Sequence, residues 1–127
     1  MTGRVVHFEI PADDLARAQD FYREAFGWNI VSMPELQYTM VSTTPIDEQG
    51  MPTEPGAING GMLARQSPIT NPVITIDVED MDAAIDKLER AGGTLVRKPQ
   101  AVGTMGIAAY FTDPEGNTLG LWQTTSS

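Results

Sequence analysis

The sequence carries the same residue pattern twice, at an offset of 66 positions, and this repeat constrains the fold more than any other feature. When positions 7–27 are placed on positions 73–93, six of the 21 residues are identical. The identities include a residue suited to cap a helix, Asp14 and Asp80, and a glycine suited to end it, Gly27 and Gly93; in the first copy Asp13 is the alternative cap. Because they include both the cap and the stop, the identities favour a duplicated unit over two unrelated amphipathic helices.

Each copy of the repeat begins with a strand that leads into a helix. In "VVHFEI" the alternation of side chains places Phe8 and Ile10 on one face, expected in the core, and His7 and Glu9 on the other. The segment "DDLARAQDFYREAFG" then repeats apolar residues at helical spacing before Gly27. The second copy, "NPVITIDVEDMDAAIDKLERAGG", has the same order. Its core-facing strand residues are expected to be Ile74, Ile76 and Val78.

Three further strand-like segments follow each helix. They are "WNIVSM", "LQYTMVS" and "AINGGML" in the first copy, and "TLVRKP", "GIAAYFT" and "TLGLWQ" in the second. The order βαβββ therefore occurs twice, which predicts an α+β fold in one domain, 1–127, built of two modules at about 1–66 and 67–127. The glycines of "GAINGG" predict a close approach between strands, since the lysine and the strand–loop–helix context of a phosphate loop are missing.

Two of the connections between these segments differ in character. The sequence "DPEGN" at residues 113–117 predicts a tight hairpin turn, because Pro114 fixes φ and Gly116 tolerates a positive φ. Residues 43–57 are rich in proline and glycine and have little apolar periodicity. This longer connection is either a plain surface loop or a lid over a binding site.

Charge and composition narrow the function classes. Acidic residues outnumber basic ones 17 to 8, and the resulting charge of −9 should repel nucleic acid and anionic membrane surfaces. The chain has no cysteine, which excludes disulfides and thiolate metal sites. No apolar run approaches the roughly 20 residues that span a bilayer, and the first residues lack the apolar length of a secretory signal. We therefore expect a cytoplasmic protein with no membrane and no nucleic-acid partner.

Four segments together resemble the vicinal oxygen chelate superfamily, the group of glyoxalases, bleomycin-resistance proteins and extradiol dioxygenases. They are "HFEIPADDLARAQDFYREAFGW", "GAINGGM", "TIDVEDMDAAIDKLERAGGTLV" and "AYFTDPEGNTLGLWQ". Within that group the sequence is most similar to small glyoxalase-like proteins related to lactoylglutathione lyase. The resemblance implies two βαβββ modules whose strands form a curled mixed sheet, a cup, with the helices on its outer face. It also implies a homodimer.

Catalytic members of this superfamily hold a divalent metal inside the cup, with ligands from the first and last strands of each module. By resemblance, His7 matches the first-strand ligand, whereas its counterpart in the second module is Val73. Gly120 stands where a metal-binding relative commonly has glutamate, and the remaining position falls in "AINGGM", where only Asn59 offers even a weak oxygen. The matched positions therefore assign no cofactor. The alternative is a divalent metal, which would be zinc, nickel, manganese or iron.

Three interpretations of His7 remain open. In the first, His7 lines a pocket that binds a small organic molecule without chemistry. In the second, a divalent metal on His7 supports a lyase, isomerase or dioxygenase reaction. In the third, His7 and Glu9 form a metal-free acid–base pair, because a neighbouring carboxylate raises the pKa of an imidazole. The residues expected to line the pocket beside this pair are Tyr38, Met40, Asn59, Thr75, Tyr110 and Trp122.

Overall fold

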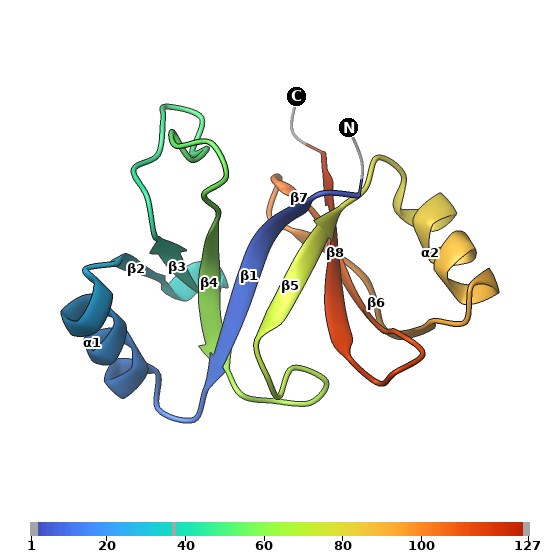
Figure 1. Ribbon diagram of the computed structural model, residues 1–127, viewed down its shortest axis with the longest axis horizontal. Helices are drawn as coiled ribbons and strands as arrows, with labels where there is room; N and C mark the ends of the chain where they lie inside the picture. The colour runs from blue at the N-terminus through green and yellow to red at the C-terminus, as the bar shows by residue number, and fades with distance from the viewer. Residues whose placement is uncertain (1–2, 37, 126–127) are drawn as a thin grey trace. The chain divides into compact units, whose positions relative to one another are not determined.

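The computed structural model describes residues 3–36 and 38–125 and confirms an α+β fold in which the order βαβββ occurs twice (Figure 1). Contacts divide the chain into two compact units: His7–Pro72, and the residues before His7 together with those from Val73 onward. The first βαβββ set comprises β1 (Val5–Ala12), α1 (Leu15–Phe26), β2 (Asn29–Met33), the short 3₁₀ helix η1 (Pro34–Leu36), β3 (Tyr38–Ser42) and β4 (Asn59–Ala64). The second comprises β5 (Val73–Asp77), α2 (Met81–Arg90), β6 (Thr94–Val102), β7 (Gly106–Thr112) and β8 (Thr118–Thr124).

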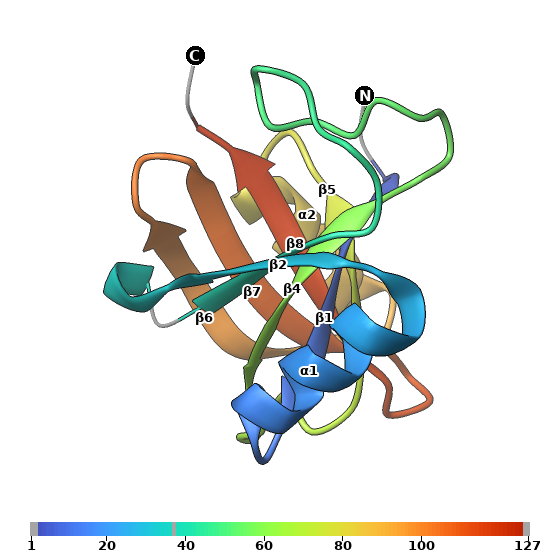
Figure 2. The ribbon, with the colours of Figure 1, turned by 90° about the vertical axis from the view of Figure 1, so that its left-hand side faces the viewer.

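In the unit His7–Pro72 the strands lie in the order β2-β3-β4-β1, with β1 parallel to β4 and the other neighbours antiparallel. Figure 2 shows α1 in front of β1 and β4 of the same unit. The helix covers one face of these strands. The core between them contains the buried residues Ile30, Val41 and Met62, against which Phe8, Ile10, Leu15, Ala18, Tyr22 and Trp28 pack. Phe8 and Ile10 therefore face the core as their alternation predicts, and His7 and Glu9 lie on the opposite face of β1.

The other unit repeats this arrangement with the strand order β5-β8-β7-β6. Strand β5 is parallel to β8, and the remaining pairs are antiparallel. Its core contains Val78, Met81, Ala109 and Leu121, with Ile76 packed against them. Ile74 was expected in this core, but 47% of its surface is exposed. The prediction for Ile74 is wrong because the apolar cluster under α2 involves only the later residues of β5.

Both helices begin at the predicted cap, and α1 ends at the predicted glycine. Helix α2 ends at Arg90 with Ala91 as its C-cap, and Gly92 at φ 107°, not Gly93, has the left-handed conformation, so the prediction that Gly93 ends this helix is wrong. A carboxylate oxygen of Asp14 accepts a hydrogen bond from the backbone N–H of Arg17 at 3.0 Å, and Asp80 does the same for Ala83 at 3.1 Å. Gly27 ends α1 at φ 70°, a left-handed conformation that glycine adopts without strain. No helix among the described residues combines the length and apolar character that a membrane crossing requires.

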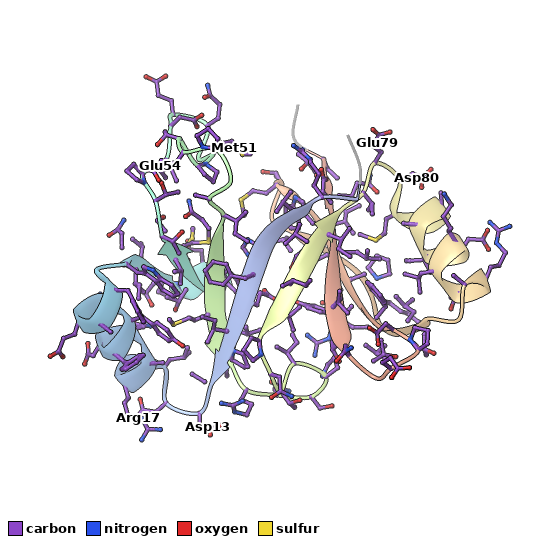
Figure 3. All side chains as sticks on the ribbon, in the orientation of Figure 1. Asp13, Arg17, Met51, Glu54, Glu79 and Asp80 are labelled. Carbon is purple, nitrogen blue, oxygen red and sulfur yellow. The ribbon has the colours of Figure 1, made fainter. Side chains whose placement is uncertain are left out.

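The two unequal connections are both ordered. In the turn at residues 113–117, the backbone N–H groups of Glu115 and Asn117 donate to the Asp113 carboxylate at 2.9 Å, and Gly116 has φ 83°. The 43–57 segment folds back on itself through a bridge between Ile46 and Pro52. Figure 3 labels Met51 and Glu54 on this segment. It is therefore a structured loop, and its role as a lid stays open.

Candidate functional site

A chain of three hydrogen-bonding side chains lies on the face of the His7–Pro72 unit opposite α1. The hydroxyl of Tyr38 donates to Oε2 of Glu9 at 2.8 Å, and Nε2 of His7 lies 2.8 Å from the same hydroxyl oxygen. The structure thus brings His7 and Glu9 together as predicted, but through Tyr38. The sequence pointed to Tyr38 only as a wall residue, and nothing local to it reveals that it stands between the other two.

The direction of the Tyr38 hydrogen bond determines the protonation of the imidazole. A hydroxyl carries one proton, and that of Tyr38 is donated to the Glu9 carboxylate. The other bond at the hydroxyl oxygen must then be donated by His7, which requires the tautomer protonated on Nε2. A proton can pass along this chain from His7 through Tyr38 to Glu9, because each pair is already within hydrogen-bonding distance.

Gly61 creates the space that the Tyr38 hydroxyl occupies. Gly61 on β4 is in register with Glu9 on β1 and with Met40 on β3. A Cβ atom added at Gly61 would overlap with the hydroxyl and ring of Tyr38, and one at Gly60 would overlap with Phe8. The close approach that "GAINGG" predicts is confirmed at both positions. At Gly61 its consequence is chemical, because any side chain there would displace the middle member of the hydrogen-bonded chain.

Burial controls the charge of the site. Glu9 is only 6% exposed. Burial lowers the pKa of the His7 imidazole below its ordinary value, and the attraction of the Glu9 carboxylate, which raises the pKa, is the smaller effect. The sequence-based expectation of a raised pKa is therefore wrong. A neutral imidazole at physiological pH can accept a proton or bind an uncharged group through Nδ1.

Met40 and Asn59 share this face with His7. Strand register pairs His7 with Asn59 and pairs Met40 with Gly61. The Asn59 side chain is tied to the start of the 43–57 loop, because its Oδ1 accepts from the backbone N–H of Thr43 at 2.8 Å and of Thr44 at 3.3 Å. It also accepts from the Thr43 hydroxyl at 3.3 Å. The carboxamide oxygen is thus fully engaged in holding the loop.

The remaining predicted pocket residues lie in the other unit. Thr75 is in register with Gly120 and Gly120 with Tyr110, so these positions share one face, to which Trp122 also belongs. This is the face opposite α2. The Arg97 guanidinium lies over the Tyr110 ring at 5.5 Å, a cation–π contact that the sequence did not reveal. That Thr75, Tyr110 and Trp122 line one pocket with His7 stays a prediction.

The donor set does not fit the metal centre that the family pattern implies. The Nε2 atom of His7 is hydrogen-bonded to Tyr38, and Oδ1 of Asn59 already accepts three hydrogen bonds. Val73 and Gly120 offer no side-chain donor atom. Within residues 3–36 and 38–125, no three His, Cys, Asp or Glu side chains gather as a metal-binding group. A divalent site needs several such donors, so a role for His7 as a metal ligand finds no support in its surroundings.

Two hollows occur within single units, one beside the start of each helix. The first, of about 340 Å³, lies beside α1, and the second, of about 400 Å³, lies beside α2. Figure 3 labels Asp13 and Arg17 at the first and Glu79 and Asp80 at the second. Neither is lined by His7, Glu9 or Tyr38. Their polar groups are largely engaged in capping or ion pairs, as in the Asp13–Arg65 pair at 2.9 Å, so the hydrogen-bonded chain remains the better candidate site.

Comparison with solved structures defines the class of fold. The methylmalonyl-CoA epimerase of Streptomyces coelicolor matches with a TM-score of 0.68, covering 99% of this chain and all of the other at 16% identity. This likeness establishes the shared architecture only. A family model described as "Bleomycin resistance protein-like N-terminal" matches residues 4–44, which contain β1, α1, β2 and β3.

Sequence relatives define the family. The glyoxylase-like domain-containing protein of Didymella fabae is 30% identical over 121 residues, which cover 91% of this chain and 90% of that protein. The CFP32 protein of Mycobacterium bovis is 30% identical over 126 residues, but the chain spans only 43% of its length. The chain belongs to the glyoxalase-like proteins of the vicinal oxygen chelate superfamily.

Proposed function

We propose that the face bearing His7, Tyr38 and Glu9 binds a small organic molecule without a metal. The observation that carries this proposal is the Tyr38 hydroxyl, which is held between His7 and Glu9 at 2.8 Å from each. This hydroxyl forms hydrogen bonds with Nε2 of His7 and the Glu9 carboxylate, the atoms that a metal ion would need as ligands. Tyr38 and Met40 supply the apolar surface, and Nδ1 of the His7 imidazole supplies a polar contact, a combination typical of small-molecule sites.

A ligand screen with a metal control tests this proposal. Metal-free protein, purified without an affinity tag, is scanned by thermal shift against uncharged and charged organic fragments and against Zn²⁺, Ni²⁺, Mn²⁺ and Fe²⁺. One-site binding at a hundred times Kd stabilises the folded state by about 2.7 kcal/mol, which such a scan detects. We expect fragments to raise the melting temperature of the protein and His7→Ala to weaken the binding of these fragments. Stoichiometric metal binding that His7→Ala abolishes would refute the proposal.

We propose as a second candidate a metal-free proton-transfer reaction, such as an isomerisation or lyase step, on the same face. It is favoured by the third group in the chain, because Tyr38 orients the imidazole that would accept or deliver the proton. The lowered pKa of His7 keeps the imidazole neutral and able to act as a base near neutral pH.

Kinetics distinguish catalysis from binding alone. For any fragment found above, solvent deuterium exchange at carbons next to its carbonyl group is followed by NMR in the presence of catalytic amounts of protein. Enzyme-dependent exchange that Glu9→Gln and His7→Gln each reduce, while the fragment still binds, would support the reaction. If a fragment binds but its deuterium exchange is no faster than in buffer alone, the result would support binding without catalysis.

A further inference from the structure

Two enclosed polar atoms at the loop end of the site have no partner among the described residues. They are the hydroxyl oxygen of Thr44 and Nδ2 of Asn59. Thr44 is only 6% exposed. A buried polar group without a hydrogen bond is costly, and in native proteins it usually marks the place of an absent water or ligand atom.

The Asn59 amide cannot remove this cost by turning over. Its oxygen accepts from the Thr43 and Thr44 backbone N–H groups, and it shares the single proton of the Thr43 hydroxyl with the Ile58 carbonyl oxygen, which is closer at 2.7 Å. A flip would place the NH₂ group against the two backbone N–H groups and lose both of their hydrogen bonds. The orientation of the amide is thus fixed. Its NH₂ group points to a place where the described residues provide no acceptor.

The two atoms belong to the candidate site. Asn59 is in register with His7 on the neighbouring parallel strand, and paired residues on neighbouring strands point to the same face about 4.8 Å apart. Thr44 is joined to Asn59 by the 3.3 Å bond from its own backbone N–H to the Asn59 oxygen. A ligand that contacts the His7 imidazole would need only to extend past one strand spacing to reach Asn59.

We propose that Asn59 Nδ2 and the Thr44 hydroxyl donate together to one oxygen of an uncharged, carbonyl-bearing ligand on the His7 face. This inference rests on the proposed function and names its ligand class. A carbonyl oxygen accepts two hydrogen bonds through its two lone pairs, which matches the two donors. A carboxylate is a poorer match, because the Glu9 carboxylate lies on the same face and the chain carries a net charge of −9. Since both donors are enclosed, binding must shift the side chains that cover them.

The test compares three variants in the free protein. Thr44→Val replaces an unpartnered hydroxyl by a methyl group of the same size, so its melting temperature should equal or exceed that of the original. Thr39→Val is the matched control, because Thr39 is equally buried in the same unit but its hydroxyl accepts from Gln19 at 3.3 Å. It should melt lower. Asn59→Asp keeps an oxygen for Thr43 and Thr44 but removes both N–H donors.

Ligand binding is then measured with acetophenone, with ethylbenzene as the analogue that lacks the oxygen and with benzoate as the charged analogue. Titrations are followed in ¹H–¹⁵N spectra, in which Asn59→Asp identifies the Asn59 side-chain signals. Acetophenone should shift these signals and bind roughly tenfold tighter than ethylbenzene, about the effect of one hydrogen bond. Thr44→Val and Asn59→Asp should remove that preference, and Thr39→Val should retain it.

Several results would overturn the inference. A Thr44→Val protein that melts lower than the original would show that the hydroxyl is satisfied in the free protein. Acetophenone binding that shifts the NMR signals of His7 but has the same affinity in Thr44→Val and Asn59→Asp would refute the donor pair and leave the proposed function intact. Tighter binding of benzoate, or no response of the face to acetophenone, would refute the ligand class. The proposed function itself fails if the wider fragment screen also finds nothing, or if the protein binds a metal through His7.

Discussion

Replacing Tyr38 by phenylalanine removes a single oxygen atom from the centre of the candidate site. The ring keeps its place over Gly61, so packing on this face is retained. The loss includes two hydrogen bonds, one donated by His7 and one accepted by Glu9, each 2.8 Å long. Because Glu9 is buried, its carboxylate cannot recover the lost bond from bulk water.

The magnitude follows from these two bonds. A hydrogen bond to a charged group contributes about 1.5–3 kcal/mol and one between neutral groups about 0.5–1.5 kcal/mol, so Tyr38→Phe should cost about 2–4 kcal/mol. In a domain of this size each kcal/mol lowers the melting temperature by about 4 °C, so we expect a decrease of roughly 8–16 °C.

Thermal and urea unfolding, followed by circular dichroism, measure this loss. Tyr22→Phe is the matched control, since Tyr22 lies in the same unit, stacks on Trp28 and donates no hydrogen bond to a described residue. It should change the free energy of unfolding by less than about 0.5 kcal/mol. Equal stabilities of Tyr38→Phe and Tyr22→Phe would refute the argument that the hydroxyl completes a buried chain.

Four further predictions concern the same site and one turn. Gly61→Ala should lower stability by more than Tyr38→Phe, because a Cβ there would overlap with the Tyr38 ring, which phenylalanine keeps, as well as with the hydroxyl; an equal or smaller loss in urea unfolding would contradict this. NMR titration of the chain's one histidine should give a pKa below about 6.5, and Glu9→Gln should lower it further by removing the favourable charge; an unchanged or higher value would contradict this. Since the folded pKa of His7 is the lower one, stability should fall as the pH drops through and below about 6.5, and His7→Gln should reduce that dependence in pH-dependent melts. Asp113→Ala should lower the protection factors for amide exchange at Glu115 and Asn117, and in the original protein acid should lower them only below the ordinary titration range of an aspartate, because the hydrogen bond from the Asn117 side chain lowers the pKa of Asp113; unchanged protection factors in the variant would contradict this.

The fold could be predicted because its signals are local and occur twice. Alternation placed Phe8 and Ile10 in the core, and the caps Asp14 and Asp80 lie where the sequence predicted them. The same local rule failed at Ile74, since alternation identifies the face of a strand but not how far the opposing helix extends along it. Burial at the ends of elements depends on tertiary packing, which the period of two does not contain.

The site could be predicted only in part, for a related reason. His7 and Glu9 are two residues apart on one strand, so their common face follows from the sequence alone. The place of Tyr38 between them depends on the register of β3 against β4 and of β4 against β1, which sets Gly61 beside Glu9. The prediction of a raised pKa for His7 was wrong because it, too, depends on the folded chain. The raising effect of Glu9 is visible in the sequence, whereas the larger lowering effect comes from burial by the folded chain.

The two modules share one strand geometry but differ in the side chains at the positions of His7 and Glu9. Thr75 is the counterpart of Glu9 at the offset of 66, and Gly120 lies in register with Thr75 as Gly61 does with Glu9. Each glycine leaves space on the face of its own unit that lies opposite the helix. A Cβ at Gly61 would meet Tyr38, whereas a Cβ at Gly120 would lie 2.9 Å from the Thr75 hydroxyl. The second module therefore retains the geometry with Val73 and Thr75 in place of the imidazole and the carboxylate, so the proposed acid–base pair occurs only at the first of the two matching positions.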